Sequence, residues 1–116
     1  MAIINELLTI TTDGLSANVD WIGLTSADNE GRYVELVDFP DRSVQVEGDF
    51  DGATVSIQGS NNGVDYHTLK DSSGNNVEFT ASGLKQIVTI SSFIRPITSG
   101  GGAAQLVDVF LLSRRN

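Results

Sequence analysis

The stretch that decides the fold lies at the centre of the chain and reads Thr54-Val55-Ser56-Ile57-Gln58-Gly59-Ser60-Asn61-Asn62-Gly63-Val64-Asp65-Tyr66-His67-Thr68-Leu69. Residues 54–58 alternate polar and apolar side chains, which is typical of a strand with one buried face. The Asn and Gly residues that follow supply the positive φ angles that a tight reversal needs. A second strand-like run begins at residue 65. The stretch therefore predicts a β-hairpin.

The same period of two recurs along most of the chain, and short clusters of Gly, Asn and Asp separate the runs. Strands are expected near residues 5–12, 32–37, 43–48, 53–59, 65–70, 76–80, 85–91, 93–98 and 104–113. Together they predict an all-β, single-domain β-sandwich over residues 1–116, with eight or nine antiparallel strands.

Residues 13–31 form the longest segment that this pattern leaves irregular. A loop of that length in a compact domain is usually functional or lies against a neighbour. Before it, the apolar side chains of residues 3–10 have a spacing that a short helix could also use, but Thr9-Ile10-Thr11-Thr12 favours a strand. We interpret residues 1–31 as an N-terminal arm followed by a long loop.

Two features set the expected order of the later strands. Pro96 lies inside a strand-like run and cannot donate a main-chain hydrogen bond, which predicts an edge strand or a bulge. The last run, 104–113, is apolar on both faces, so it should lie centrally in a sheet or in a subunit contact. Asp108 interrupts that run. Either it pairs with Arg95, or it occupies an exposed position on a bent strand.

Composition excludes several classes of function. Fifteen acidic residues against seven Lys and Arg give a net charge of −8, which disfavours binding to a nucleic-acid backbone. Cysteine is absent, so disulfides and thiolate zinc sites are excluded and a reducing compartment is expected. No run is long enough for a membrane span, and the first residues do not resemble a secretion signal. We expect synthesis in a bacterial cytoplasm.

No set of residues forms a catalytic motif. His67 is the single histidine, and no serine or carboxylate is placed beside it by a recognised spacing. The loop carboxylates Asp38, Asp41, Asp49 and Asp51 could hold calcium, although acidic residues are common in turns because they bond the local backbone. The sequence thus predicts a protein that is not an enzyme and has no cofactor or metal.

Aromatic residues leave a second class of function open. Trp21, Tyr33, Phe39 and Tyr66 could form a platform for sugar rings, as in carbohydrate-binding β-sandwiches, or they could be core residues. A glycan-binding module is therefore the alternative to a structural assembly protein.

The central hairpin, together with Val77-Glu78-Phe79-Thr80, Phe93-Ile94-Arg95-Pro96 and Ser99-Gly100-Gly101, resembles the capsid decoration (cement) proteins of tailed bacteriophages. The resemblance covers about residues 44–113. It implies a β-sandwich of jelly-roll type and a role on the outside of the virion, assembled in the host cytoplasm. Residues 1–42 match no pattern of that family.

The resemblance also implies a partner and a mechanism. The partner would be the major capsid protein, whose subunits the chain would bridge so that the shell resists internal pressure. A homo-oligomer is expected, with a trimer favoured over a dimer, since each bound subunit raises the effective concentration of the next. We expect the contact on the N-terminal segment and the 13–31 loop, and the partner-binding residues to be Ile3, Ile4, Leu7, Trp21 and Arg95.

Overall fold

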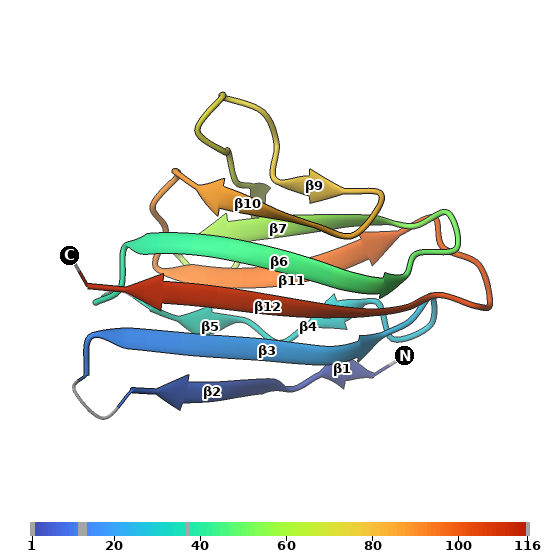
Figure 1. Ribbon diagram of the computed structural model, residues 1–116, viewed down its shortest axis with the longest axis horizontal. Helices are drawn as coiled ribbons and strands as arrows, with labels where there is room; N and C mark the ends of the chain where they lie inside the picture. Colours follow the sequence, from blue (N-terminus) through green and yellow to red (C-terminus); the bar gives the residue numbers. More distant parts are fainter. Residues whose placement is uncertain (1, 12–13, 37, 116) are drawn as a thin grey trace.

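The computed structural model describes residues 2–11, 14–36 and 38–115, which form twelve strands in two sheets and contain no helix (Figure 1). The two sheets pack face to face around one hydrophobic cluster. The predicted all-β sandwich is confirmed, with more strands than the eight or nine expected. Since the described residues include no helix, none of them forms a helix that could cross a membrane.

The five-stranded sheet has the order β10-β6-β12-β3-β2. Its strands are β10 (Gly83–Ile87), β6 (Asp41–Asp49), β12 (Leu106–Arg114), β3 (Ser16–Leu24) and β2 (Glu6–Ile10), and every pairing is antiparallel. β12 lies in the middle, as its apolar sequence predicted. Its Val107, Val109 and Leu111 point into the core, whereas Leu106 and Leu112 are exposed on the outer face.

The seven-stranded sheet has the order β1-β4-β11-β7-β8, with β5 also paired to β11 and β9 to β7. Its strands are β1 (Ile3–Ile4), β4 (Glu30–Gly31), β5 (Val34–Glu35), β7 (Thr54–Ser60), β8 (His67–Thr68), β9 (Glu78–Phe79) and β11 (Phe93–Ser99). β7 and β8 pair in antiparallel fashion, which confirms the central hairpin.

The expectation that residues 13–31 form an irregular loop is wrong. Residues 16–24 form β3, a nine-residue strand between β12 and β2. Ala17, Val19 and Trp21 are buried and alternate with the more exposed Asn18 and Asp20. The period of two was therefore present, but a small residue on the buried face and an apolar one on the exposed face made it weak. Residues 12 and 13 lie outside the described part of the chain.

The edge strand or bulge expected at Pro96 is also not found in the described part of the chain, because β11 is flanked on both sides by other strands. Pro96 lies opposite Ile57, whose N–H and C=O bond Val77 and Leu69 on the far side of β7. The pair is thus a non-hydrogen-bonded one, and the proline nitrogen points the other way. On that side, the pairing with β5 stops at Val34 opposite Ile94 and the pairing with β4 is at Glu30 opposite Ile97, so Pro96 lies between the pairings with two short strands.

Asp108 does not pair with Arg95. Its Oδ1 accepts a hydrogen bond from the Gly23 N–H at 2.9 Å, at the point where the register of β12 and β3 shifts between Val107 and Val109. Gly23 has a φ of +87°, which favours glycine. The carboxylate therefore satisfies a backbone donor that the bulge leaves without a strand partner.

The N-terminal segment joins the two sheets. β1 runs parallel to β4 in the seven-stranded sheet, and the chain then crosses at Asn5 so that β2 pairs with β3 in the five-stranded sheet. The predicted strand near residues 5–12 is confirmed as β2. In Figure 1 this segment lies along the lower border of the sandwich, where β2 is the last strand.

Candidate functional site around Arg95

A pocket of about 320 Å³ opens on the outer face of the seven-stranded sheet. Arg95 points outward there because its neighbours in β11, Ile94 and Pro96, are buried on the inner face. We call this hollow the Arg95 pocket. Its lining comes from β1, β4, β11, the 32–33 segment and the loop after β7, and consists of Ile3, Glu30, Arg32, Tyr33, Gly63, Val64, Tyr66 and Arg95.

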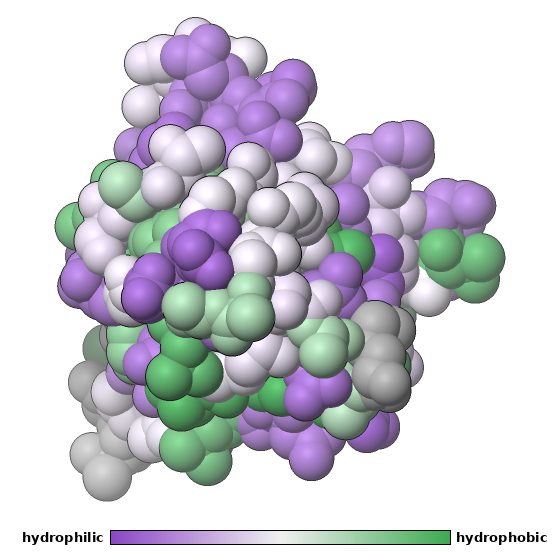
Figure 2. All heavy atoms as spheres, turned by 90° about the vertical axis from the view of Figure 1, so that its right-hand side faces the viewer, coloured by the Kyte–Doolittle hydropathy of each residue, from purple (hydrophilic) through white to green (hydrophobic). Residues whose placement is uncertain are grey.

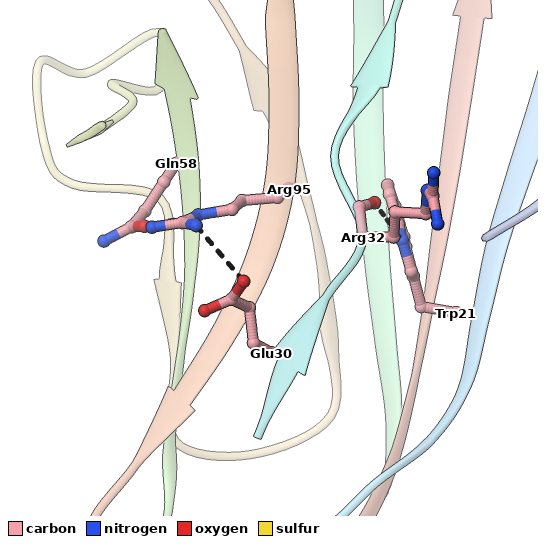
Figure 3. Close-up of polar contacts among 5 residues, drawn as sticks. All are labelled: Trp21, Glu30, Arg32, Gln58 and Arg95. Carbon is pink, nitrogen blue, oxygen red and sulfur yellow. Dashed lines mark hydrogen bonds and ion pairs between the residues drawn. The ribbon is translucent and has the colours of Figure 1, made fainter. Parts of the chain in front are cut away.

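Three neighbours hold the Arg95 guanidinium. Its Nη1 lies 3.4 Å from a carboxylate oxygen of Glu30, and its Nε donates to Oε1 of Gln58 at 3.1 Å. Gln58 is the residue directly opposite Arg95 in the β7–β11 ladder. Figure 3 shows Glu30 and Gln58 reaching Arg95 from β4 and β7. The charge of Arg95 is therefore balanced within the pocket.

The ring of Tyr66 completes the surroundings of Arg95. The guanidinium carbon lies 3.9 Å from the ring centroid, which is a cation–π contact. Burial raises the pKa of the Tyr66 hydroxyl, an effect that Arg95 opposes and that Tyr33 and Glu30 reinforce. The hydroxyl oxygen is itself buried and has no hydrogen-bond partner among the described residues. Tyr66 therefore stays protonated at neutral pH and cannot serve there as a base.

Trp21 supports the Arg95 pocket from the core side. Its indole Nε1 donates to the Arg32 carbonyl at 2.8 Å, a contact drawn in Figure 3. Next to it, a Cβ on Gly31 would lie 2.6 Å from Pro96 Cγ and 2.8 Å from Trp21 Cδ1. The glycine thus lets β4 approach the core closely. Because Trp21 is only 1% exposed, it supports the pocket and is not part of its surface.

The structure brings together two of the five predicted partner-binding residues. Ile3 and Arg95 both line the Arg95 pocket. Ile4 packs against the core, and Leu7 lies on the outer face of the other sheet, opposite Asp20. Sequence reasoning missed Glu30 and Gln58 as partners of Arg95. Only the strand register reveals them, because β4 and β7 are far from β11 in the sequence.

The candidate metal and catalytic residues do not form a site in the described part of the chain. It contains no group of three or more His, Cys, Asp or Glu side chains that could hold a metal ion. Asp51 accepts from the Ala104 N–H at 2.9 Å, and Asp41 pairs with Arg114 at 2.6 Å. His67 is exposed and lines a separate, open groove of about 550 Å³ beside β8.

The four aromatic residues considered for sugar binding do not form a platform. Trp21 and Phe39 belong to the core. Tyr33 is exposed and makes an edge-to-face contact with Phe93, while one face of Tyr66 is covered by Arg95. Only two tyrosines thus remain at the rim of the Arg95 pocket.

Apolar side chains gather instead on the N-terminal segment and the strand beside it. Ile3, Leu7, Leu8 and Ile10 are between 46% and 62% exposed, and Ile22 of β3 is 53% exposed. We call β2 with Ile3 and Ile22 the N-terminal edge. Figure 2 looks at the end of the sandwich that lies on the right in Figure 1; one area of apolar surface (green) lies in its lower half, the side of β1, β2 and β3, and others lie at mid-height. Exposed apolar clusters of this kind are typical of protein–protein contacts.

Comparison with known proteins shows a likeness of fold. No family model matches the sequence, and no curated protein matches it either. The fold is similar to that in the crystal structure of the SPBc2 prophage-derived protein YomS, with a TM-score of 0.57 over 92% of this chain and 98% of that one. Sequence identity is 11%, so the likeness is one of fold alone.

Proposed function

We propose that this chain is a structural protein of a bacteriophage particle, which binds the outside of the capsid and bridges subunits of the major capsid protein. The observation that carries the proposal is the N-terminal edge, where apolar side chains from β1, β2 and β3 stay exposed. A surface of that kind suits contact with another protein better than contact with a small molecule.

Two further observations support this reading. The fold is shared over nearly the full length of both chains with a prophage-derived protein. The Arg95 pocket holds a balanced ion pair and a protonated tyrosine, which suits recognition rather than catalysis. A glycan-binding module would need exposed aromatic rings, and Trp21 is buried.

The test is cosedimentation with purified, expanded heads of the phage that encodes the chain, assembled without it. Leu7→Lys is the informative variant, because Leu7 is exposed on an edge strand of the five-stranded sheet. Leu84→Lys is the matched control, since Leu84 is an exposed leucine on the opposite edge strand, β10, and the change in net charge is the same.

We expect saturable binding of the wild type and of Leu84→Lys, and binding at least about tenfold weaker for Leu7→Lys, which corresponds to about 1.4 kcal/mol. Equal loss in both variants would show that net charge, not the N-terminal edge, governs binding. Saturable binding to a glycan array without capsid association would replace the capsid role by the glycan-binding alternative.

A further inference from the structure

β2 forms one free edge of the five-stranded sheet. Among the described residues, no strand pairs with it on the side away from β3. An edge strand presents a row of unused N–H and C=O groups, which act as a template for another strand. The chemistry of this edge therefore calls for an extended segment of protein.

The hydrogen bond between Thr11 N–H and Ser16 C=O, 2.9 Å long, shows which groups are unused. These residues continue the register in which Ile10 lies opposite Ala17. Hydrogen-bonded pairs alternate along an antiparallel ladder. Consequently Leu7 and Thr9 bond β3, whereas the main chains of Glu6, Leu8 and Ile10 point outward.

The other edge of the same sheet is protected. In β10, Lys85 lies opposite Val44 on the inner side, and its amino group donates to the Glu78 carbonyl at 3.0 Å. An inward-pointing lysine on an edge strand is a known device against edge-to-edge pairing. Two of the three inner positions of β2, Leu8 and Ile10, are apolar and about half exposed. The third, Glu6 opposite Trp21, lies at the start of the strand, and its carboxylate is 3.8 Å from Arg32.

We propose that β2 pairs with β2 of a second copy of this chain, antiparallel, about a two-fold axis at Leu8. In that register the outward-pointing main chains meet as Glu6 with Ile10, Leu8 with Leu8, and Ile10 with Glu6, so every unused group finds a partner. No like charges face each other, because Glu6 lies opposite an isoleucine. Thr9 lies opposite Leu7.

This contact is isologous and closes as a dimer, in which the two five-stranded sheets become one continuous sheet. It favours two-fold symmetry over the three-fold symmetry expected from the family resemblance. A pair of five-residue strands is small beside a standard interface of roughly 1,600 Å². The dimer is therefore weak in dilute solution and strengthens when copies are held close together.

Engineered disulfides test the register, because the chain contains no cysteine. Leu8→Cys places two Cα atoms about 5.5 Å apart across the axis, within the range of about 4.4–6.8 Å that a disulfide spans. Glu6→Cys should not link to itself, since its own copy lies roughly 14 Å along the strand at about 3.4 Å per residue. A mixture of Glu6→Cys and Ile10→Cys should link.

We expect Leu8→Cys to form covalent dimers at least tenfold faster in a glutathione redox buffer than Leu84→Cys on the β10 edge. Equal rates for these two variants, or self-linking of Glu6→Cys as fast as that of Leu8→Cys, would overturn the proposal.

A second variant needs no cross-link. Leu8→Pro removes an N–H that points outward and leaves the bonds to β3 in place. Sedimentation equilibrium should show the average mass of the wild type rising with concentration and that of Leu8→Pro staying monomeric, with unchanged circular dichroism. A wild type that stays monomeric at millimolar concentration would also refute the dimer. The sedimentation experiment contains no phage heads, so its result tests the dimer independently of capsid binding.

Discussion

Two partly or fully buried arginines, one in each sheet, are held in opposite ways. Arg42 of β6 is 3% exposed, and its guanidinium donates to the carbonyls of Phe39, Ser91 and Leu36 at 2.9, 3.0 and 2.6 Å. Arg95 of β11 has 21% of its side chain exposed and is held by side chains, those of Glu30, Gln58 and Tyr66. One arginine is fixed by the backbone and the other by its neighbours in a pocket.

The difference shows that two arginines on packed strands can be held by different kinds of partner and so have different roles. Burial lowers the pKa of Arg42 because loss of solvent disfavours the charged form. Its three acceptor carbonyls belong to the corner between β5 and β6 and to the segment before β11, which lie next to the β5–β11 pairing, so Arg42 links the five-stranded sheet to that part of the other sheet. The partners of Arg95 are side chains, so a substitution at Glu30 or Gln58 removes a contact in the pocket without removing a main-chain hydrogen bond.

The largest expected effect follows from removing Arg42. Arg42→Met keeps the volume but leaves the carbonyls of Phe39 and Ser91 without this donor, whereas the Leu36 carbonyl still accepts from the Phe39 N–H at 3.2 Å. Each buried acceptor left unsatisfied costs about 1–3 kcal/mol, so we expect the free energy of unfolding to fall by at least about 2 kcal/mol. Urea denaturation followed by tryptophan fluorescence measures it, because Trp21 lies in the core.

Arg114→Met is the control for that experiment. Arg114 pairs with Asp41 at 2.6 Å, but its side chain is 64% exposed, so we expect a loss below about 1 kcal/mol. If the two substitutions lower the free energy of unfolding equally, the hydrogen bonds from Arg42 to the main chain do not stabilise the fold as argued above.

A smaller effect is expected at the ion pair of the Arg95 pocket. A double-mutant cycle with Glu30→Gln and Arg95→Met should give a coupling free energy of about 0.5–1 kcal/mol, because both side chains are only partly exposed. The matched cycle uses Glu6 and Arg32, which are 3.8 Å apart with Arg32 61% exposed, and should give almost none. Equal coupling free energies in the two cycles would mean that burial in the pocket does not strengthen the ion pair between Glu30 and Arg95.

The sequence predicted the strands whose patterns were strong. The hairpin at residues 54–69, the central place of β12 and the strand near residues 5–12 follow from alternation and turn chemistry, which act over short distances. β3 was missed because Ala17 on its buried face is small and Ile22 on its exposed face is apolar, which weakens the alternation. The place of Pro96 was wrong because its side that lacks an N–H lies between the pairings with two short strands, which no local pattern encodes.

The candidate site was less accessible from the sequence. Ile3 and Arg95 were singled out and do share a pocket, but the partners of Arg95 come from β4 and β7 and depend on strand order. Arg42 was not singled out from the sequence. Nothing in the sequence showed that this arginine would be buried among carbonyls, because its acceptors at residues 36, 39 and 91 are main-chain atoms that carry no residue-specific signal.

The smallest effect concerns Tyr66 and appears only at alkaline pH. Its buried hydroxyl has no partner among the described residues, so Tyr66→Phe loses no hydrogen bond and should not lower the free energy of unfolding at pH 7. The folded-state pKa of Tyr66 is raised, with burial as the main cause. Above the ordinary pKa of about 10, the unfolded chain therefore loses the proton first, and the wild type loses stability as the pH rises toward the folded-state pKa. Tyr66→Phe lacks this loss, so the variant should become the more stable of the two between pH 10 and 11, as urea unfolding at a series of pH values would show. A difference between wild type and Tyr66→Phe that stays constant from pH 8 to 11 would mean that the hydroxyl is hydrated, and that the ring contacts Arg95 without being enclosed by the pocket.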